Sequence, residues 1–403
     1  MNDEISKFLQ TRIDAGDFPS AVYLVAEKGE ILMQDALGYA VVEPERIPAQ
    51  IDTIYDLASL TKVLVTGFLC AKLVEEGRVE LDQIIEHYLP ELIEFGIPIE
   101  PRQGFEYDCL DVLISELLTH HSGYQSWKPF YLLLDPQKSH TLNDVLFFIG
   151  NRLAPQMEPE VIYSDLNFIM LAGLIGKLYG KRLDQVAENE IFEPLGLTYT
   201  SYNPSMDVRR RIAASEKGNE FEKNTCIELG YLQPDEKNPV AIAPGSDQIR
   251  NPQSAFRNYQ IWGDVHDGNA YFMGGVAGHA GLFSSAEEVF KIAQQFLPRF
   301  TALLKPETCE LFCTNFTPGM NEHRSFAFQL ASTPDSTAGT LMSPQSFGHL
   351  GFTGTSLWID PVAERVFILL TNRTHNHALP FVNINSVRRR FHDLAIGQLD
   401  GNS

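Results

Sequence analysis

Apolar and polar residues alternate at both ends of the chain, in a pattern typical of half-buried strands. Each end carries two such segments separated by a tight polar turn, which is the pattern of a β-hairpin. The four expected strands are residues 21–26, 31–40, 355–361 and 365–372. Helical spacing predicts a first helix over 4–15 and a last one over 381–397. We therefore expect one antiparallel sheet built from both chain ends.

Between the two ends, the apolar spacing changes to the period of helices. The expected helices are residues 61–76, 111–120, 142–152, 166–179, 183–192 and 286–296. The stretch 203–275 is rich in Asn, Pro, Gly and Asp, and it is expected to form long surface excursions. The predicted fold class is α/β, of the α+β kind. It is an antiparallel sheet flanked by helices, with a mainly helical lobe inserted between its two halves.

The expected organisation is a single catalytic unit, 1–403, made of two lobes. Residues 1–60 and 340–403 are predicted to form the sheet lobe, and 61–339 the mainly helical lobe with long loops. A chain of 403 residues, 44% of them hydrophobic and 21% charged, is large enough for such a core. A cleft between two lobes is the usual place for a site, so we expect the active site there.

The charge balance limits the range of partners. With 52 acidic against 31 basic residues, the formal net charge is −21, so the average surface repels nucleic acid and anionic membranes. We therefore expect no nucleic-acid partner and no membrane partner. The oligomeric state does not follow from the sequence.

The cysteines and the N-terminal residues predict a reducing compartment. The five cysteines are an odd number without a CxxC pair, which fits neither a disulfide framework nor a zinc knuckle. The N-terminus is acidic where a signal peptide needs positive charge, and no run of about 18 apolar residues occurs. We expect a soluble, cytoplasmic protein.

The first motif with chemical meaning is Ser59-Leu60-Thr61-Lys62, where the helix expected over 61–76 begins. Residues three apart share one face of a helix, so the Lys62 ammonium is expected near the Ser59 hydroxyl. A serine is a weak nucleophile until a neighbour takes its proton, and desolvation can lower the pKa of a lysine far enough to help. The helix N-terminus adds a positive end and a free N–H for an oxyanion.

A simpler interpretation is that Ser59 caps the helix and Lys62 is a solvated charge in its first turn, which is the usual meaning of an isolated S-x-x-K pattern. Two observations favour the catalytic interpretation. The pattern occurs once in the chain, and the lysine lies in an otherwise apolar segment, where a charge needs a reason.

A second motif, Tyr163-Ser164-Asp165, lies just before the helix expected over 166–179. A tyrosine facing the cleft can pass a proton between the nucleophile and the leaving group. Alternatively, Asp165 caps the helix and Tyr163 packs beneath it. Both interpretations can hold together.

A third motif, residues 347–355, contains His349 and Gly351 and enters the strand expected over 355–361. Glycines there allow backbone to approach a ligand closely, and the edge of a strand offers an N–H to an oxyanion. Without the other motifs, such a stretch is usually a bend and its histidine a polar residue at the edge.

In their order and spacing, the three motifs resemble the S-x-x-K, Y-x-N and K-T-G signatures of the serine β-lactamase, D,D-peptidase and esterase superfamily, in its class C branch. Residues 117–123, 194–197 and 274–285 agree as well. The resemblance implies a hydrolase of a small-molecule ester or amide, without cofactor or metal. It implies Ser59 as the acylated nucleophile and Lys62 and Tyr163 as the proton-transfer pair. The oxyanion hole is then made by the backbone N–H groups of Ser59 and Phe352.

Two positions depart from the family pattern. Asp165 replaces the asparagine of Y-x-N, so an amide donor is lost and an acceptor able to hold Lys62 remains. His349 replaces the lysine of the third motif, so a fixed cation becomes a group that is mostly neutral at pH 7. Both changes favour an esterase or amidase over the alternative of a β-lactamase or D,D-peptidase.

The segment 262–281 resembles a branch that includes amidases releasing peptides from N-acetylmuramic acid, which favours cell-wall-derived fragments as substrates. The residues predicted to support substrate binding are Asp165, His349, Gly351, His266 and His279. A non-catalytic binder of peptidoglycan fragments is a further alternative, because a fold does not guarantee chemistry. The intact Ser59, Lys62 and Tyr163 argue against it.

The same segment contains possible metal ligands, namely Asp264, His266, Asp267 and His279. Their spacing matches no known site pattern, and a hydrogen-bonded loop explains them equally well. We therefore expect no metal.

Overall fold

A computed structural model describes residues 3–92, 112–134, 141–153, 155, 160–232 and 256–401 of the protein. Cys109, Asp111 and the part of the expected excursion over 233–255 lie outside the described residues.

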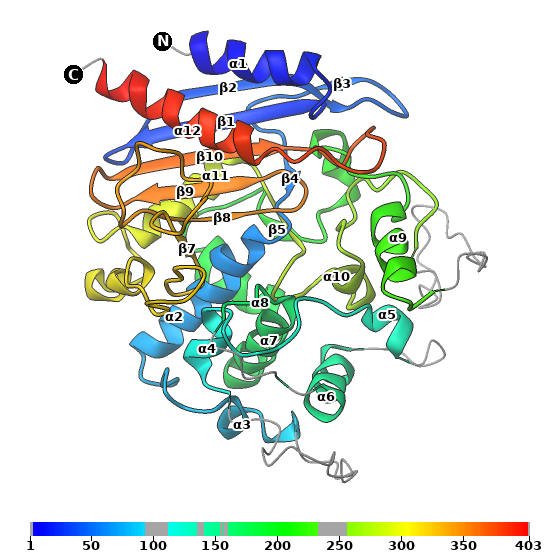
Figure 1. Ribbon diagram of the computed structural model, residues 1–403, viewed down its shortest axis with the longest axis vertical. Coiled ribbons are helices and arrows are strands. Elements are labelled where there is room, and N and C mark those ends of the chain that lie inside the picture. Colours follow the sequence, from blue (N-terminus) through cyan, green and yellow to red (C-terminus); the bar gives the residue numbers. More distant parts are fainter. Residues whose placement is uncertain are drawn as a thin grey trace.

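Seven strands form the main sheet, in the order β3-β2-β1-β10-β9-β8-β7, and every pair of neighbours is antiparallel (Figure 1). They are β1 (Ser20–Glu27), β2 (Glu30–Val41), β3 (Ile47–Pro48), β7 (Gln329–Leu330), β8 (Phe347–Leu350), β9 (Ser356–Asp360) and β10 (Arg365–Thr371). The two ends of the chain meet where β1 pairs with β10, with Leu24 opposite Ile368. The predicted antiparallel sheet built from both chain ends is confirmed.

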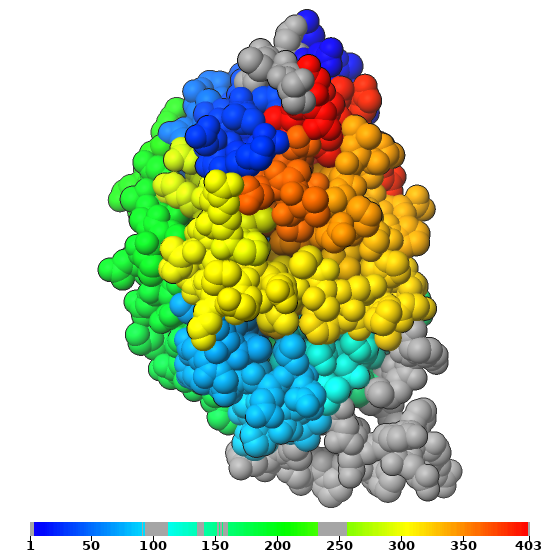
Figure 2. All heavy atoms as spheres, turned by 90° about the vertical axis from the view of Figure 1, so that its left-hand side faces the viewer, coloured from blue at the N-terminus to red at the C-terminus, as the bar shows by residue number. Residues whose placement is uncertain are grey.

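The two faces of the sheet pack differently, because successive side chains of a strand point to opposite faces. Tyr23 packs with Phe391 under α1 (Asp3–Asp14) and α12 (Asn385–Asp400). Val22 and Leu24 point the other way, into the larger core shared with α11 (Ala286–Ala293) and the inserted helices. The first and last helices lie side by side (Figure 1), and their blue and red residues gather at one end of the molecule in Figure 2.

The part of the chain between the terminal segments is mostly helical. Its α-helices before α11 are α2 (Phe68–Glu75), α3 (Ile85–Tyr88), α4 (Ile114–Leu118), α5 (Phe130–Leu133), α6 (Leu142–Arg152), α7 (Asp165–Tyr179), α8 (Leu183–Ala187), α9 (Glu220–Glu228) and α10 (Gly268–Phe272). Shorter 3₁₀ and π segments are η1 (Lys62–Gly67), η2 (Pro90–Leu92), η3 (Glu188–Phe192), η4 (Met206–Arg211), η6 (Gln294–Phe296) and η7 (Pro306–Phe312). A small second sheet has the order β4-β6-β5, with β4 (Tyr55–Asp56), β5 (Ser201–Tyr202) and β6 (Leu282–Ser284).

The described helices include none with both the length and the apolar character needed to cross a bilayer.

Several helix boundaries differ from the predicted ones, including those of three segments. The segment after Ser59 begins with the π-helix η1 and becomes α-helical only at Phe68. The helix expected over 111–120 ends at Leu118, because His120 adopts a positive φ of 60°. The last helix begins at Asn385 rather than 381, where the side chain of Asn383 accepts the Asn385 N–H.

The prediction that residues 203–275 form long surface excursions is wrong for much of the stretch that the structure describes. That part contains η4, α9 and α10, and several of its polar residues are buried. These helices are short, so they leave little periodicity in the sequence. Side-chain bonds to backbone hold the segment instead: the buried Arg257, for example, donates to the carbonyl oxygens of Val265 and His266.

Candidate active site

A cavity of about 830 Å³ is bordered by residues of the main sheet and its turns and by residues of the inserted helical segments. The predicted site residues in its wall are Ser59, Tyr163, Asp165, His266, His349, Gly351 and Phe352. Lys62 and His279 are buried behind this wall, where Lys62 contacts Ser59 and Asp165. The structure therefore brings all nine predicted site residues to one place.

Ser59 and Lys62 are in direct contact. Lys62 Nζ donates a hydrogen bond of 2.9 Å to Ser59 Oγ, as the three-residue spacing predicts. Every residue of η1 is buried, so the lysine side chain has no solvent around it. The simpler interpretation of Lys62 as a solvated charge is wrong.

The charge of Lys62 is balanced by Asp165, the first residue of α7. Lys62 Nζ lies 2.7 Å from Asp165 Oδ1, and it donates a hydrogen bond of 3.1 Å to the carbonyl oxygen of His279. Burial alone would lower the pKa of Lys62, but Asp165 and Tyr163 together raise it above its ordinary value. The expectation of a lowered lysine pKa is therefore wrong, because a carboxylate shares the buried position. Lys62 is held as an ammonium.

Tyr163 lies against this pair. Lys62 Nζ is 4.8 Å from the centroid of the Tyr163 ring. Burial raises the pKa of the Tyr163 phenol, while the Lys62 charge and hydrogen bonds to Lys62 and Ser59 act to lower it. The ring also packs on His120, with centroids 4.5 Å apart, so the packing interpretation holds alongside the contact with Ser59. The N-cap of α7 is Ser164, so Asp165 does not cap that helix.

Residues 351–355 form the turn between β8 and β9, and two hydrogen bonds fix it close to Ser59. Thr353 Oγ1 donates to the carbonyl oxygen of Asp56 at 2.7 Å, and Thr355 Oγ1 donates to that of Leu57 at 3.0 Å. Within the described residues, the backbone N–H groups of Ser59 and Phe352 donate no hydrogen bond. Both residues border the cavity.

Gly351 is needed for this arrangement. A Cβ at this position would run into Thr355 Oγ1 and would lie 2.5 Å from the carbonyl oxygen of Leu57. No other residue fits here without displacing the turn.

His349 is a neutral group in the cavity wall. Its Nδ1 lies 2.9 Å from the carbonyl oxygen of Leu350, and its ring centroid is 5.7 Å from that of Tyr163. Burial, followed by the charges of Lys62 and Arg324, holds the pKa of His349 well below its ordinary value. The position of the family's third-motif lysine carries no fixed cation here, as predicted.

His266 supports the ring of Phe352. The two rings are stacked with centroids 5.5 Å apart, and His266 Nε2 lies 2.8 Å from Glu216 Oε2. Burial opposes a positive charge on His266, but Glu216 outweighs it and raises the pKa of the imidazole.

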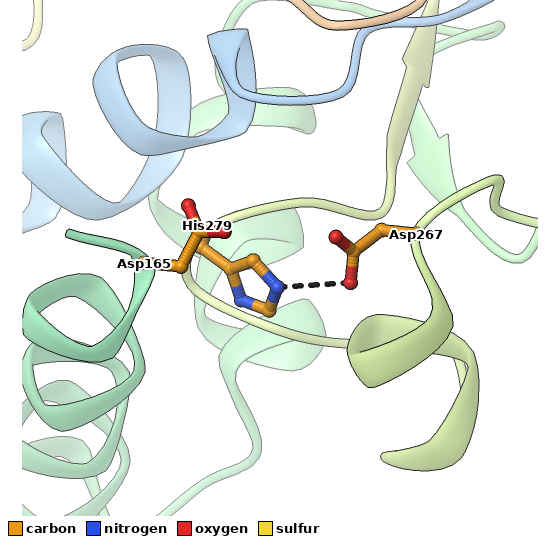
Figure 3. A group of neighbouring side chains, drawn as sticks. All are labelled: Asp165, Asp267 and His279. Carbon is orange, nitrogen blue, oxygen red and sulfur yellow. Dashed lines mark hydrogen bonds and ion pairs between the residues drawn. The ribbon is translucent and has the colours of Figure 1, made fainter. Parts of the chain in front are cut away.

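Asp165, Asp267 and His279 form a compact group, with their possible ligand atoms within 4.8 Å of one another (Figure 3). His279 Nε2 lies 3.0 Å from Asp267 Oδ1. Although burial opposes it, His279 holds the pKa of Asp267 well below its ordinary value. The Lys62 ammonium beside Asp165 already supplies the positive charge that a metal ion would bring. Of the four metal ligands considered from the sequence, only Asp267 and His279 belong to this group among the described residues. His266 instead pairs with Glu216.

Three arginines in the cavity wall were missed by the sequence interpretation, namely Arg324, Arg373 and Arg388. Arg324 pairs with Glu322 at 2.6 Å and lies 5.6 Å from the centroid of the Tyr163 ring. Arg388 shares the buried side of the last helix with Val387 and Phe391. A charge on an apolar stripe was the available signal for Arg388.

A further wall comes from α9, in the stretch expected on the surface. Phe221 packs on Phe352 with ring centroids 4.8 Å apart. Glu222 is buried beside it and accepts hydrogen bonds from the Gly268 N–H and the Tyr131 hydroxyl. Burial and the nearby charge of Asp267 raise the pKa of Glu222 to about 7. No periodic signal marked this wall in the sequence.

The fold, together with the contact between Ser59 in the cavity wall and the buried Lys62, defines a serine hydrolase with the architecture of penicillin-binding proteins. The family model described as beta-lactamase matches residues 5–388. A putative D-alanyl-D-alanine carboxypeptidase of Escherichia coli (strain K12) is 30% identical over 396 residues, covering 93% of this chain and 82% of the relative. The chain belongs to the β-lactamase family.

Solved structures show the same fold. EstCE1, a hydrolase with promiscuous acyltransferase activity, has a TM-score of 0.69 and 18% identity, covering 98% of this chain and 97% of its own. A D-amino acid amidase from Ochrobactrum anthropi SV3 has a TM-score of 0.67 and 18% identity, covering 100% of both chains.

Proposed function

We propose that this protein hydrolyses an ester or amide bond of a small substrate through an acyl-enzyme on Ser59. The observation that carries the proposal is the hydrogen bond of 2.9 Å between Lys62 Nζ and Ser59 Oγ in the wall of a substrate-sized cavity. A buried lysine costs free energy unless its charge is paired. Here Asp165 and the His279 carbonyl pair with Lys62 and hold its ammonium within hydrogen-bond distance of the Ser59 hydroxyl.

Tyr163 is the proposed base. Lys62 has three N–H donors, and Ser59, Asp165 and the His279 carbonyl can accept all three, so it serves as a fixed positive charge. The Tyr163 phenolate accepts the Ser59 proton as Oγ attacks the carbonyl carbon, and the phenol then returns the proton to the leaving group. Lys62 stabilises the phenolate during this exchange. Water regenerates Ser59 by the reverse sequence.

The N–H groups of Ser59 and Phe352 are the proposed oxyanion hole. Donors that already point at the developing negative charge need no rearrangement during the reaction. The bonds from Thr353 and Thr355 to the segment before Ser59 hold the two donors at a fixed separation.

In the family pattern, the third-motif lysine binds a carboxylate of the substrate. Because His349 is neutral and Asp165 is an acceptor, we propose a substrate that does not need such a contact. We therefore favour an esterase or an amidase acting on cell-wall-derived fragments. The second candidate is a carboxypeptidase of the kind named for the E. coli relative. Arg373 supports this candidate, since it borders the cavity and has no carboxylate within 4 Å in the described structure.

The test is the intact mass of the protein after exposure to a fluorophosphonate. We expect one adduct on the wild type and none on Ser59→Ala. An unreactive wild type, or an equal adduct on Ser59→Ala, contradicts the proposal. Binding of peptidoglycan fragments without hydrolysis of any ester or amide in a substrate panel would support the non-catalytic alternative.

A further inference from the structure

Two guanidinium groups donate hydrogen bonds to the backbone of the turn 351–355. Arg388, in the first turn of α12, donates from one nitrogen to the carbonyl oxygens of Gly351 at 3.0 Å and Thr355 at 2.9 Å. Arg373, just after β10, donates from Nε to the carbonyl oxygen of Phe352 at 2.7 Å. The Arg373 guanidinium carbon also lies 5.0 Å from the centroid of the Phe352 ring, so Arg373 contacts both the backbone and the side chain of this residue.

Within the described residues, neither charge is neutralised by a carboxylate. In the described part of the chain, no carboxylate oxygen lies within 4 Å of Arg373 or Arg388, and Arg388 Nε is buried with no acceptor. Arg388 is only 4% exposed. Burial, and for Arg388 also the charge of Arg373, lowers the pKa of Arg388 to about 9 and that of Arg373 to about 10, so both stay cationic at neutral pH.

This placement is unfavourable for stability alone. A buried, unpaired charge costs several kcal/mol in general, and a cation in the first turn of a helix also opposes the helix dipole. An apolar residue at the position of Arg388 would extend the stripe of Val387 and Phe391. The arrangement therefore calls for a functional reason.

The reason lies in the peptide group that joins Gly351 to Phe352. The carbonyl oxygen that Arg388 binds and the Phe352 N–H belong to the same peptide group. A cation on the oxygen draws electron density from the nitrogen, so the N–H becomes a stronger donor, as in any polarised hydrogen-bond chain. A buried guanidinium is also a strong donor to a carbonyl oxygen, which restricts rotation of the peptide.

We propose that Arg388, assisted by Arg373, is a positioning residue of the oxyanion hole that fixes and polarises the Gly351–Phe352 peptide. The positive field then acts on the oxyanion of the tetrahedral intermediate through the Phe352 N–H. The inference rests on the proposed function, because it requires Phe352 to be an oxyanion donor. The proposed effect does not depend on an anionic group of the substrate, so a neutral ester should show it.

The test measures hydrolysis of p-nitrophenyl acetate, a neutral ester, by the wild type, Arg388→Gln, Arg388→Lys and Arg373→Gln. Loss of one direct oxyanion donor costs on the order of 10²–10³-fold in kcat, so loss of a residue acting through the donor is expected to cost about 10–100-fold. KM is expected to stay within about twofold, because the ground-state carbonyl gains little from the hole. Arg388→Lys, which keeps the charge, should recover part of kcat.

A second measurement separates positioning from a purely structural role. It is the inhibition constant of a boronic acid, which forms an anionic tetrahedral adduct on serine and so needs the oxyanion hole. This constant should rise across the variants by the same factor as kcat/KM falls. Arg390→Gln is the matched control, since Arg390 is exposed two residues further along the same helix. That variant should behave as the wild type.

Unchanged neutral-ester kinetics in Arg388→Gln would overturn the inference and leave recognition of a substrate carboxylate as the role of this arginine. A fall in kcat without a matching change in boronate affinity would overturn it as well. If Arg388→Gln does not fold, Arg373→Gln and Arg388→Lys decide the question. A wild type that forms no fluorophosphonate adduct indicates instead that the proposed function itself has failed.

Discussion

Lys62 Nζ and Asp165 Oδ1 lie 2.7 Å apart inside the molecule, and this ion pair determines which proton-transfer role each nearby group can take. The carboxylate keeps the lysine protonated, so the lysine supplies charge and not a free base. A family position usually occupied by a neutral amide thereby gains control over the charge next to the nucleophile. The pH dependence of the reaction should reveal this control.

The rate of acylation is expected to rise with pH. In the proposed mechanism Tyr163 reacts as a phenolate, and burial holds the pKa of its phenol above the ordinary value of 10, so the active fraction is small at neutral pH. Below that pKa the phenolate fraction grows tenfold per pH unit, and log kcat/KM for a neutral ester should rise with a slope of about 1 between about pH 6 and about pH 9. Rates of Ser59→Ala are subtracted to remove spontaneous hydrolysis. A flat profile would exclude Tyr163 as the base.

Asp165→Asn is expected to move this profile to lower pH. The Asp165 charge raises the pKa of both Lys62 and Tyr163, so its removal lowers both. A loss of one close charge corresponds to a shift of roughly one pH unit. The measurement is the pH profile of kcat/KM for p-nitrophenyl acetate. A profile that keeps its position would show that the carboxylate does not control these groups.

His349→Lys is expected to destabilise the protein instead of restoring a β-lactamase-like site. His349 is buried, and the charges of Lys62 and Arg324 already disfavour a proton on it. Among the described residues no carboxylate pairs with His349, so a fixed cation there should cost about 3 kcal/mol of unfolding free energy in urea titrations. His349→Gln, which is neutral, is the control and should cost much less. Equal stability of the two variants would contradict the electrostatic argument.

Gly351→Ala is expected to lower kcat for the neutral ester by about 10–100-fold, because the added Cβ displaces the turn that carries the Phe352 N–H. Gly397→Ala in α12 is the control, since a Cβ there meets nothing within 4 Å. That change should raise stability by about 0.5–1 kcal/mol and leave kcat unchanged. Full activity in Gly351→Ala would show that the turn can be displaced without harm.

Glu222 is expected to make the protein less stable as the pH rises. Its pKa in the folded protein is about 7, above the ordinary value of 4.5 for a glutamate, so the folded state binds the proton more tightly than the unfolded state. By linkage, the stabilisation is present below about pH 4.5 and is lost as the pH rises toward 7, by roughly 3 kcal/mol at most. Glu222→Gln should weaken this dependence in urea titrations. An unchanged dependence in the variant would assign the effect to other groups.

Local patterns were enough to predict the sheet and the contact between Ser59 and Lys62. Strand alternation has a period of two residues, and the spacing of S-x-x-K spans one helical turn, so both are visible within a short window. The neutral state of His349 also followed from its residue type. These features depend on neighbours in the sequence or on intrinsic pKa values.

The features that could not be predicted depend on distant partners. The raised pKa of Lys62 requires Asp165 at 2.7 Å, which is a property of packing between η1 and α7. The walls formed by α9 and Arg373 come from segments whose local patterns gave no functional signal. The division into lobes at residues 60 and 340 stays a prediction.

The pairing of β1 with β10 has a consequence for biosynthesis. Ala21 leaves the ribosome long before its partner Thr371 and the guanidinium of Arg388 are made. Until β10 is made, β1 can pair with β2 on one edge, but its other edge lacks its native partner strand while the helical segments are made. We expect ribosome-bound fragments that end before β10 to lack a fluorophosphonate-reactive Ser59, because the turn 351–355 is not yet held in place.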